Sequence, residues 1–183
     1  MKKLFFLAAL LFVAALSYSQ PTSKAMLMRV WRVSDGDNVS VVDSSRKVGF
    51  NIRLLCIDAP EVNNLYSREQ PYGQLATLQT RALLLGATVL VDTFGRDQFK
   101  RMLGRVYFGE GVTDFGLYSV SQGWSWSYAH PGAGEYLKSL EALNKTAKKE
   151  KRGLFGLKGR KTRPETWRKN KMGSPREVLP PGV

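Results

Sequence analysis

Apolar and polar positions alternate along the chain in short blocks, which predicts strands separated by turns and helices. Five segments share the apolar, β-branched composition and turn boundaries of strands: 25–33, 38–42, 48–57, 87–94 and 102–108. Three segments carry apolar residues at helical spacing: 74–85, 113–122 and 134–151. The first three strands are joined by short turns, so the chain is predicted to begin its folded part with a meander.

The third predicted strand carries charge at both ends. Arg53 precedes four consecutive apolar residues, and Asp58 and Glu61 follow them. An unbroken apolar run is typical of a strand buried on both faces, and Pro60 ends it. We interpret the strand as a rigid spacer that holds a guanidinium at one end and two carboxylates at the other.

The N-terminus has the pattern of a secretory signal. Two lysines precede an uncharged apolar run over 4–16, which is long enough for a signal segment and too short to span a bilayer. Small residues favour cleavage before Gln20. Residues 1–19 are therefore predicted to be a signal peptide, and the protein is expected to be exported, either periplasmic or secreted, with no transmembrane segment after cleavage. An uncleaved anchor is the alternative.

The formal net charge of +13 is concentrated near the C-terminus. Residues 144–183 hold 13 of the 28 Lys and Arg residues but only 3 of the 15 acidic residues. Such a segment could bind nucleic-acid phosphates or an anionic cell surface. It could also be a solvated helix end and linker. The charge run alone does not distinguish these three interpretations. We expect 20–157 to form the folded domain and 158–183 to be an extended or disordered basic tail.

The single cysteine and single histidine exclude several kinds of site. Cys56 rules out an internal disulfide, and its apolar neighbours favour a small buried hydrophobe. His130 lies in a loop-like context, so a Cys/His or Ser/His/Asp mechanism has little support. A zinc site would need a cluster of Cys and His residues, which the chain lacks.

Acidic residues gather at two predicted turns. Asp35 and Asp37 follow the first strand, and Asp58 and Glu61 follow the third. In a meander these two positions lie at the same end of the sheet, which would place up to four carboxylates close together. Such a cluster is costly without a cation, and hard cations such as Ca²⁺ prefer carboxylate and carbonyl oxygens.

Two arginines complete a set of groups suited to phosphate chemistry. Arg53 and Arg101 carry the forked side chain that binds phosphate oxygens in a bidentate manner. A cation and arginines neutralise charge on a reacting phosphate, and a carboxylate orients or deprotonates water. Each residue also has an ordinary structural interpretation as a turn residue, strand exit or ion-pair partner, but their conjunction favours phosphodiester hydrolysis.

These motifs resemble the staphylococcal nuclease family. Matching stretches follow one another in order within 25–168: 33–37, 53–61, 72–73, 97–103, 123–124, 151–155 and 164–168. The resemblance implies an α+β fold, a five-stranded OB-fold β-barrel with about three α-helices. It also implies a Ca²⁺-dependent nuclease that cuts DNA and RNA and leaves 3′-phosphates. We expect a monomer.

The resemblance implies a role for eight residues. They are the Ca²⁺ ligands Asp37, Asp58 and the carbonyl of Ala59, the catalytic residues Arg53, Glu61 and Arg101, and the substrate contacts Phe99 and Tyr128. The chain departs from the family pattern at Asn38, where threonine is usual, and at Phe99, where the best-known member has tyrosine. For Trp124, Trp126 and Tyr128, core packing is the alternative, and we favour it for at least two of the three.

Two rival functions follow from the same features. Some relatives of this family are catalytically inactive OB modules that bind nucleic acid or protein, and they typically lack one or more of the charged residues. All five of those residues are present here, which favours the enzyme. A protein that docks on the cell envelope through its basic tail is the other rival.

Overall fold

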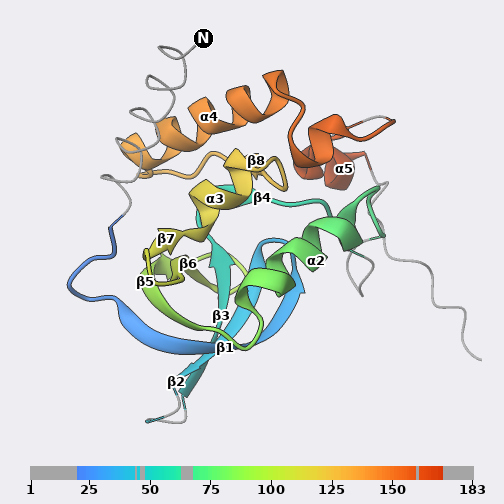
Figure 1. Ribbon diagram of the computed structural model, residues 1–183. Coiled ribbons are helices and arrows are strands. Elements are labelled where there is room, and N and C mark those ends of the chain that lie inside the picture. The colour runs from blue at the N-terminus through green and yellow to red at the C-terminus, as the bar shows by residue number, and fades with distance from the viewer. Residues whose placement is uncertain (1–19, 44, 46–47, 63–67, 160, 171–183) are drawn as a thin grey trace, which may run out of the picture.

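A closed β-barrel forms the centre of the fold. The computed structural model describes residues 20–43, 45, 48–62, 68–159 and 161–170 (Figure 1). The barrel strands are β1 (Met26–Asp35), β2 (Asn38–Asp43), β3 (Val48–Leu54), β5 (Thr88–Arg96) and β6 (Met102–Phe108). They pair in the order β3-β2-β1-β5-β6, and β6 returns to β3. The predicted five-stranded barrel is therefore confirmed.

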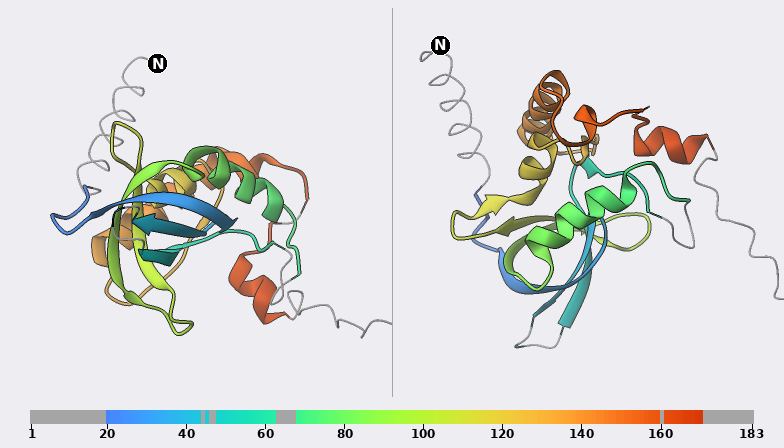
Figure 2. Two further views of the ribbon diagram at one scale, coloured as in Figure 1. Left: turned by 90° about the horizontal axis from the view of Figure 1, so that it is seen from below. Right: turned by 45° about the vertical axis from the view of Figure 1, so that its right-hand side comes forward.

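Helices and two short strand pairs surround the barrel. The helices are α2 (Gly73–Leu84), α3 (Phe115–Ser121), α4 (Gly134–Lys149) and α5 (Pro164–Lys169), with a 3₁₀ turn, η1 (Gly153–Gly156). The short strands are β4 (Ile57–Asp58), β7 (Thr113–Asp114) and β8 (Trp126–Ser127); β4 pairs with β8, and β7 pairs with β6. Figures 1 and 2 show α3 and α4 packed together on one side of the barrel, with α2 lying along another. The three predicted helices are confirmed, and α5 is a fourth.

Alternating β-branched residues fill the barrel interior. Val30, Val41, Val91 and Val106 are fully buried, and Ile52 is 1% exposed. Each comes from a different strand, so every strand contributes its inward face to one shared core. This core fixes the positions of the strand ends, from which the polar side chains described below project.

Closure of the barrel brings distant turns together. β2 and β3 are antiparallel, with Asn38 opposite Arg53. β3 and β6 are parallel, with Ile52 opposite Met102. Arg101 immediately precedes Met102 and therefore reaches the same end of the barrel as Asn38 and Arg53.

The strand predicted over 48–57 is broken in the structure. β3 ends at Leu54, and Cys56 has φ 60°, in the left-handed region that an extended strand cannot contain. The chain then changes partner: the Leu55 amide donates to the Gly104 carbonyl, and the Cys56 carbonyl accepts from the Tyr128 amide. The rigid-spacer interpretation is therefore wrong, because this turn folds the two ends of the stretch toward each other.

The expectation of an extended or disordered tail is wrong for α5. Pro164 occupies the start of the helix, where its missing N–H costs nothing and its fixed φ suits the first turn. Lys169 pairs with Glu165 one turn earlier at 2.6 Å. Residues 171–183 lie outside the described part of the chain, as does the predicted signal peptide, 1–19. None of the helices that the structure describes is long and apolar enough to cross a bilayer.

Gly73 sets how closely α2 approaches the turn that carries Glu61. A Cβ added at Gly73 would lie 2.1 Å from the Glu61 carbonyl oxygen, a backbone atom that cannot move aside cheaply. We expect Gly73→Ala to lower the free energy of unfolding by about 1–3 kcal/mol, as other overpacking changes do. Urea unfolding measures this effect. Gly111→Ala is the control, since its added Cβ would meet nothing closer than 3.8 Å; equal stability loss in both variants would contradict the explanation.

Candidate active site

Arg53 lies at the centre of a buried charge cluster. Its Nη1 is 3.0 Å from Oδ2 of Asp37, and its Nη2 is 3.0 Å from Oδ1 of Asp58. All three side chains are nearly excluded from solvent. Burial alone would lower the pKa of Arg53, but the two carboxylates hold it above its usual value. One guanidinium therefore brings together two carboxylates from different turns.

The turn before β2 holds Asp37 in place. Asp35 accepts hydrogen bonds from the Asp37 amide at 3.0 Å and from the Asn38 side chain at 2.8 Å. Oδ2 of Asp37 also accepts the Ala59 amide at 2.6 Å. Burial raises the pKa of Asp37 well above its usual range, and Arg53 opposes this shift only in part.

Gly36 allows this turn to contact the chain after β4. A Cβ at Gly36 would lie 2.6 Å from the Cβ of Ala59. The Gly36 carbonyl also accepts a hydrogen bond from the Thr80 hydroxyl of α2. The Asp-Gly-Asp sequence is therefore needed for close approach as well as for turn formation.

Arg101 reaches the cluster through Asn38. Its Nη1 donates to Oδ1 of Asn38 at 2.7 Å, and the Asn38 amide donates to Oδ1 of Asp37 at 2.7 Å. Its Nε pairs with Asp97 at 2.7 Å. Although partial burial opposes the shift, hydrogen bonds from Arg101 lower the pKa of Asp97. Asn38 thus connects the second arginine to the carboxylates.

Phe99 stands at the tip of the turn between β5 and β6. Its side chain is 69% exposed, and the Arg101 guanidinium lies 5.4 Å from the centre of its ring. An exposed ring beside a guanidinium offers a flat surface to a nucleic-acid base. The structure therefore places this predicted contact residue next to the predicted phosphate-binding arginine.

Glu61 is positioned by a buried glutamine. The backbone N–H of Glu61 donates to Oε1 of the Gln70 side chain at 3.2 Å. The backbone N–H of Gln70 donates to the Glu61 carbonyl at 2.8 Å. Gln70 is only 2% exposed, and its Nε2 donates to the Thr162 carbonyl at 2.6 Å. Gln70 therefore ties the turn that carries Glu61 to the segment before α5.

A third arginine, Arg168 of α5, contacts the same carboxylates. Its two Nη atoms lie 3.1 and 3.0 Å from Oδ1 and Oδ2 of Asp58. Nη1 also donates to Oε1 of Glu61. Burial alone would lower the pKa of Arg168, but hydrogen bonds and charges from Asp58 and Glu61 raise it.

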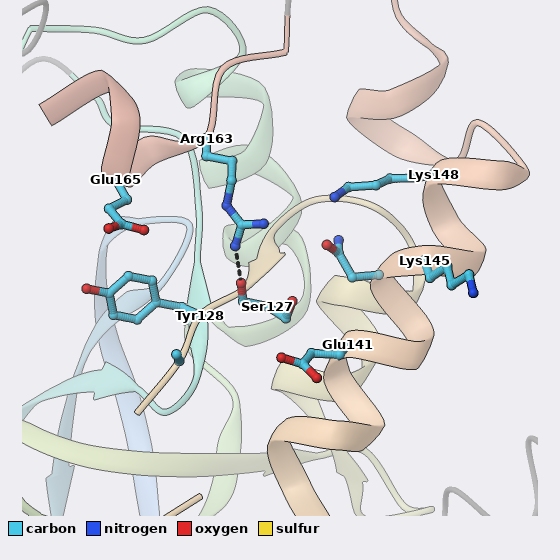
Figure 3. A pocket seen from close by; sticks show the side chains of 9 residues that line it. Ser127, Tyr128, Glu141, Lys145, Lys148, Arg163 and Glu165 are labelled. Atoms are coloured by element: carbon cyan, nitrogen blue, oxygen red, sulfur yellow. Dashed lines mark hydrogen bonds between the residues drawn. The ribbon is translucent and has the colours of Figure 1, made fainter. Parts of the chain in front are cut away.

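Tyr128 lies beside a polar pocket at the end of β8. The pocket has a volume of about 470 Å³ and is lined from the end of β8 and the residues after it, from α4, and from the start of α5 with the residue before it. Figure 3 shows Arg163 and Lys148 reaching into it from opposite sides, while Lys145 points away. Arg163 donates to the Ser127 carbonyl at 2.6 Å. Trp126, for which core packing is the alternative, is 3% exposed and packs edge-on against Phe155.

Among the described residues, no three His, Cys, Asp or Glu side chains gather closely enough to hold a metal ion together. The carboxylates of Asp37 and Asp58 both contact Arg53, and the N–H of Ala59, whose carbonyl is the third predicted ligand, donates to Asp37. The predicted ligands of these three residues are all oxygen atoms. Oxygen donors of this kind suit hard cations such as Ca²⁺, which complete their coordination with water. The donor chemistry therefore fits Ca²⁺, provided water supplies several ligands.

Sequence reasoning placed most of the cluster but missed Asn38, Gln70 and Arg168 as its supports. Asn38 directly follows Asp37, so its side-chain amide could be predicted to donate hydrogen bonds to both Asp35 and Asp37. Gln70 lies in a polar loop, and Arg168 is 110 residues from Asp58. Nothing in the local pattern around Gln70 marks it as a neighbour of the carboxylates. Arg168 ends the 164–168 stretch that matches the family, but the resemblance assigned it no role.

Comparisons with known proteins give a consistent result. The family model described as staphylococcal nuclease homologue matches residues 51–156. An uncharacterized endonuclease of Escherichia coli O157:H7 is 39% identical over 127 residues, which cover 69% of this chain and 75% of that protein. The probable endonuclease LCL3 of Yarrowia lipolytica is 32% identical over 129 residues, covering 68% and 57%. Protein ParB of Escherichia coli is 27% identical over 150 residues, covering 78% and 80%.

Proposed function

Since the chain belongs to the staphylococcal nuclease homologue family and is a nuclease that hydrolyses phosphodiester bonds, we propose that it is a Ca²⁺-dependent endonuclease acting on DNA and RNA. The observation that carries this proposal is the cluster of Asp37, Arg53 and Asp58, with Glu61 at its edge. Arg101 joins the cluster from another turn through Asn38. These charged groups suit the hydrolysis of a phosphodiester bond.

Asp37, Asp58 and the Ala59 carbonyl are the residues that would hold Ca²⁺. Their oxygens match the preference of a hard cation. When bound, the cation would neutralise charge that builds up on the phosphate during the reaction. Neither imidazole nor thiolate is among these donors, so the set does not favour zinc.

The arginines and Glu61 would carry the remaining chemistry. Arg53 and Arg101 present planar forks that bind phosphate oxygens, and both already take part in fixed hydrogen bonds that limit their motion. Glu61 would orient water or accept its proton as the water oxygen attacks phosphorus. Cleavage of the bond between phosphorus and the 5′ oxygen would leave a 3′-phosphate and a 5′-hydroxyl.

Substrate binding would use charge and stacking. Phe99 projects into solvent beside Arg101, where a base could stack while the guanidinium holds a phosphate. The basic segment after residue 143 would add salt-dependent affinity for polyanions. Contact of this segment with an anionic cell surface is a further proposal, separable from cleavage.

A nuclease assay tests the proposal. The protein from Gln20 onward is incubated with DNA and with RNA in Ca²⁺, Mg²⁺ or EDTA, and the ends of the products are analysed. We expect cleavage of both substrates in Ca²⁺, 3′-phosphate ends and no cleavage in EDTA. Full activity in EDTA would overturn the cation dependence, and products with 5′-phosphates would overturn the assigned bond.

A catalytically inactive binding module is the second candidate. It would bind nucleic acid in a salt-dependent manner without cutting it in any divalent cation. The presence of Arg53, Glu61 and Arg101 around the two aspartates favours the enzyme, because a binding module does not need them together.

We also propose that the protein is exported as a monomer after removal of 1–19. The apolar run that follows two lysines supports export. N-terminal sequencing of the protein recovered from cell fractions tests it: a mature chain that begins at Gln20 outside the cytoplasm is expected. A cytoplasmic chain that retains Met1 would contradict export.

A further inference from the structure

Arg168 covers the carboxylate that the proposed cation would need. Both oxygens of Asp58 accept hydrogen bonds from Arg168, at 3.1 and 3.0 Å, in a bidentate pair. Oδ1 of Asp58 also accepts from Arg53 at 3.0 Å. The Asp58 side chain is only 3% exposed. Two guanidinium groups therefore already surround the oxygens of Asp58.

The same guanidinium also reaches Glu61. Nη1 of Arg168 is shared between Oδ1 of Asp58 and Oε1 of Glu61. The proposed cation ligand and the proposed water-orienting carboxylate are thus bound by one positive group. A divalent cation placed at Asp58 would meet this charge at close range and be repelled by it.

The segment that carries Arg168 is fastened at several points. Arg163 donates to the Ser127 carbonyl at 2.6 Å, and the buried Gln70 donates to the Thr162 carbonyl at 2.6 Å. Nε1 of Trp167 donates to the Arg68 carbonyl at 3.4 Å. An isolated ion pair on a surface contributes little to stability, but these contacts hold α5 where Arg168 bonds to Asp58.

The neighbouring charge on α5 behaves differently. Lys169 pairs with Glu165 within the helix at 2.6 Å, and its side chain is 72% exposed. Arg168 and Lys169 are adjacent residues of equal charge, and only Arg168 has hydrogen bonds to Asp58 and Glu61. Comparing variants of Arg168 and Lys169 therefore distinguishes the effect of direct contact with the carboxylates from a general effect of positive charge.

We propose that Arg168 is a further residue of the nuclease site, which competes with the divalent cation for Asp58 and Glu61 and so sets how tightly the cation binds. This inference rests on the proposed Ca²⁺ site. A bound cation would have to displace the Arg168 guanidinium from the Asp58 carboxylate. The free energy of the Arg168–Asp58 interaction would therefore be subtracted from the affinity for the cation. Because such coupling is reciprocal, it is measurable from either side.

Calorimetric titration of the protein with CaCl₂, in the absence of nucleic-acid substrate, tests the competition. We expect Arg168→Gln to bind Ca²⁺ about 5- to 150-fold more tightly than the wild type, the usual range for coupled sites. Arg168→Lys should lie between them, since an ammonium keeps the charge but loses the fork. Lys169→Gln is the charge-matched control and should bind Ca²⁺ as the wild type does.

The outcomes distinguish this inference from the proposed function. If the wild type binds Ca²⁺ and Arg168→Gln binds it no more tightly, the competition is wrong and the cation site stands. An equal gain in Lys169→Gln would also overturn it, by showing only a general charge effect. If neither the wild type nor any variant binds Ca²⁺, the cation site fails and the inference fails with it.

Thermal unfolding gives a second readout that does not depend on activity. In EDTA, Arg168→Gln should unfold at a lower temperature than the wild type, because it loses the contacts to Asp58 and Glu61. In saturating Ca²⁺ this difference should shrink or change sign, because the cation has already displaced Arg168. The same difference with and without Ca²⁺ would show that Arg168 and the cation do not compete.

Discussion

Replacement of Glu61 by glutamine is expected to reduce the nuclease rate about 10²- to 10⁴-fold, the usual contribution of a positioned acid–base group. Glutamine keeps the size of the side chain but cannot accept a proton from water. The backbone of Glu61 would remain fixed, since Gln70 bonds its amide and carbonyl. Initial rates on DNA at saturating Ca²⁺ measure the effect, and thermal unfolding checks that the fold is kept.

Glu69→Gln is the matched control for this variant. Glu69 is exposed and lies one residue before Gln70, so the change removes the same charge nearby without touching the cluster. Its rate should equal that of the wild type. A Glu61→Gln enzyme as fast as this control would remove Glu61 from the mechanism.

Replacement of Arg53 is expected to have the largest effect on stability. Arg53→Gln leaves Asp37 and Asp58 buried without their shared partner, and removing one member of a buried ion pair costs about 3–5 kcal/mol. Nuclease activity should be lost as well, because the phosphate-binding fork is gone. Urea unfolding in EDTA measures the loss of stability without a contribution from a cation.

Two further substitutions separate charge from geometry at this position. Arg53→Lys keeps a positive charge but cannot bridge two carboxylates as a planar fork does, so we expect a smaller loss of stability with activity still abolished. Arg32→Gln removes an exposed arginine of β1 and should change the free energy of unfolding by no more than about 0.5 kcal/mol. Active Arg53→Lys would show that a point charge is sufficient at the site.

Local patterns were enough to predict the barrel strands and three helices. Alternating β-branched residues identify each barrel strand because one face of each strand fills the core, as Val30, Val41 and Val91 do. The grouping of carboxylates at one end also followed from the meander. In the structure, Asp37 and Asp58 both pair with the guanidinium of Arg53, so the two turns that carry them do lie close together.

The break at Cys56 could not be predicted from composition. Leu55, Cys56 and Ile57 are all apolar and buried, so they fit a continuous strand as well as a turn. An extended chain from Arg53 to Asp58 would separate the two residues by about 17 Å, whereas their side chains lie 3.0 Å apart. The positive φ at Cys56 is what makes this contact achievable. Burial raises the pKa of the Cys56 thiol to about 11, which agrees with the predicted structural role.

Contacts between distant segments explain the remaining differences. Arg101 meets Asn38 because β3 and β6 pair in parallel, and a strand pattern carries no information about which strands close a barrel. Two features of the sequence favour a helix at α5: Pro164 at its start and the four-residue spacing of Glu165 and Lys169. Its position over Asp58 depends on contacts of Gln70 and Ser127, which lie far from it in sequence.

The charge cluster around Arg53 and Asp58 extends beyond the segment by which the family is recognised. The matched segment covers 51–156, yet Asp37 precedes it and Arg168 follows it. A fragment trimmed to the matched boundaries would lack one proposed cation ligand and the residue proposed to compete with the cation. Swapping that segment between relatives would therefore exchange β5, β6 and the end of β3, while β1, β2 and two proposed determinants of cation affinity would stay with the host chain.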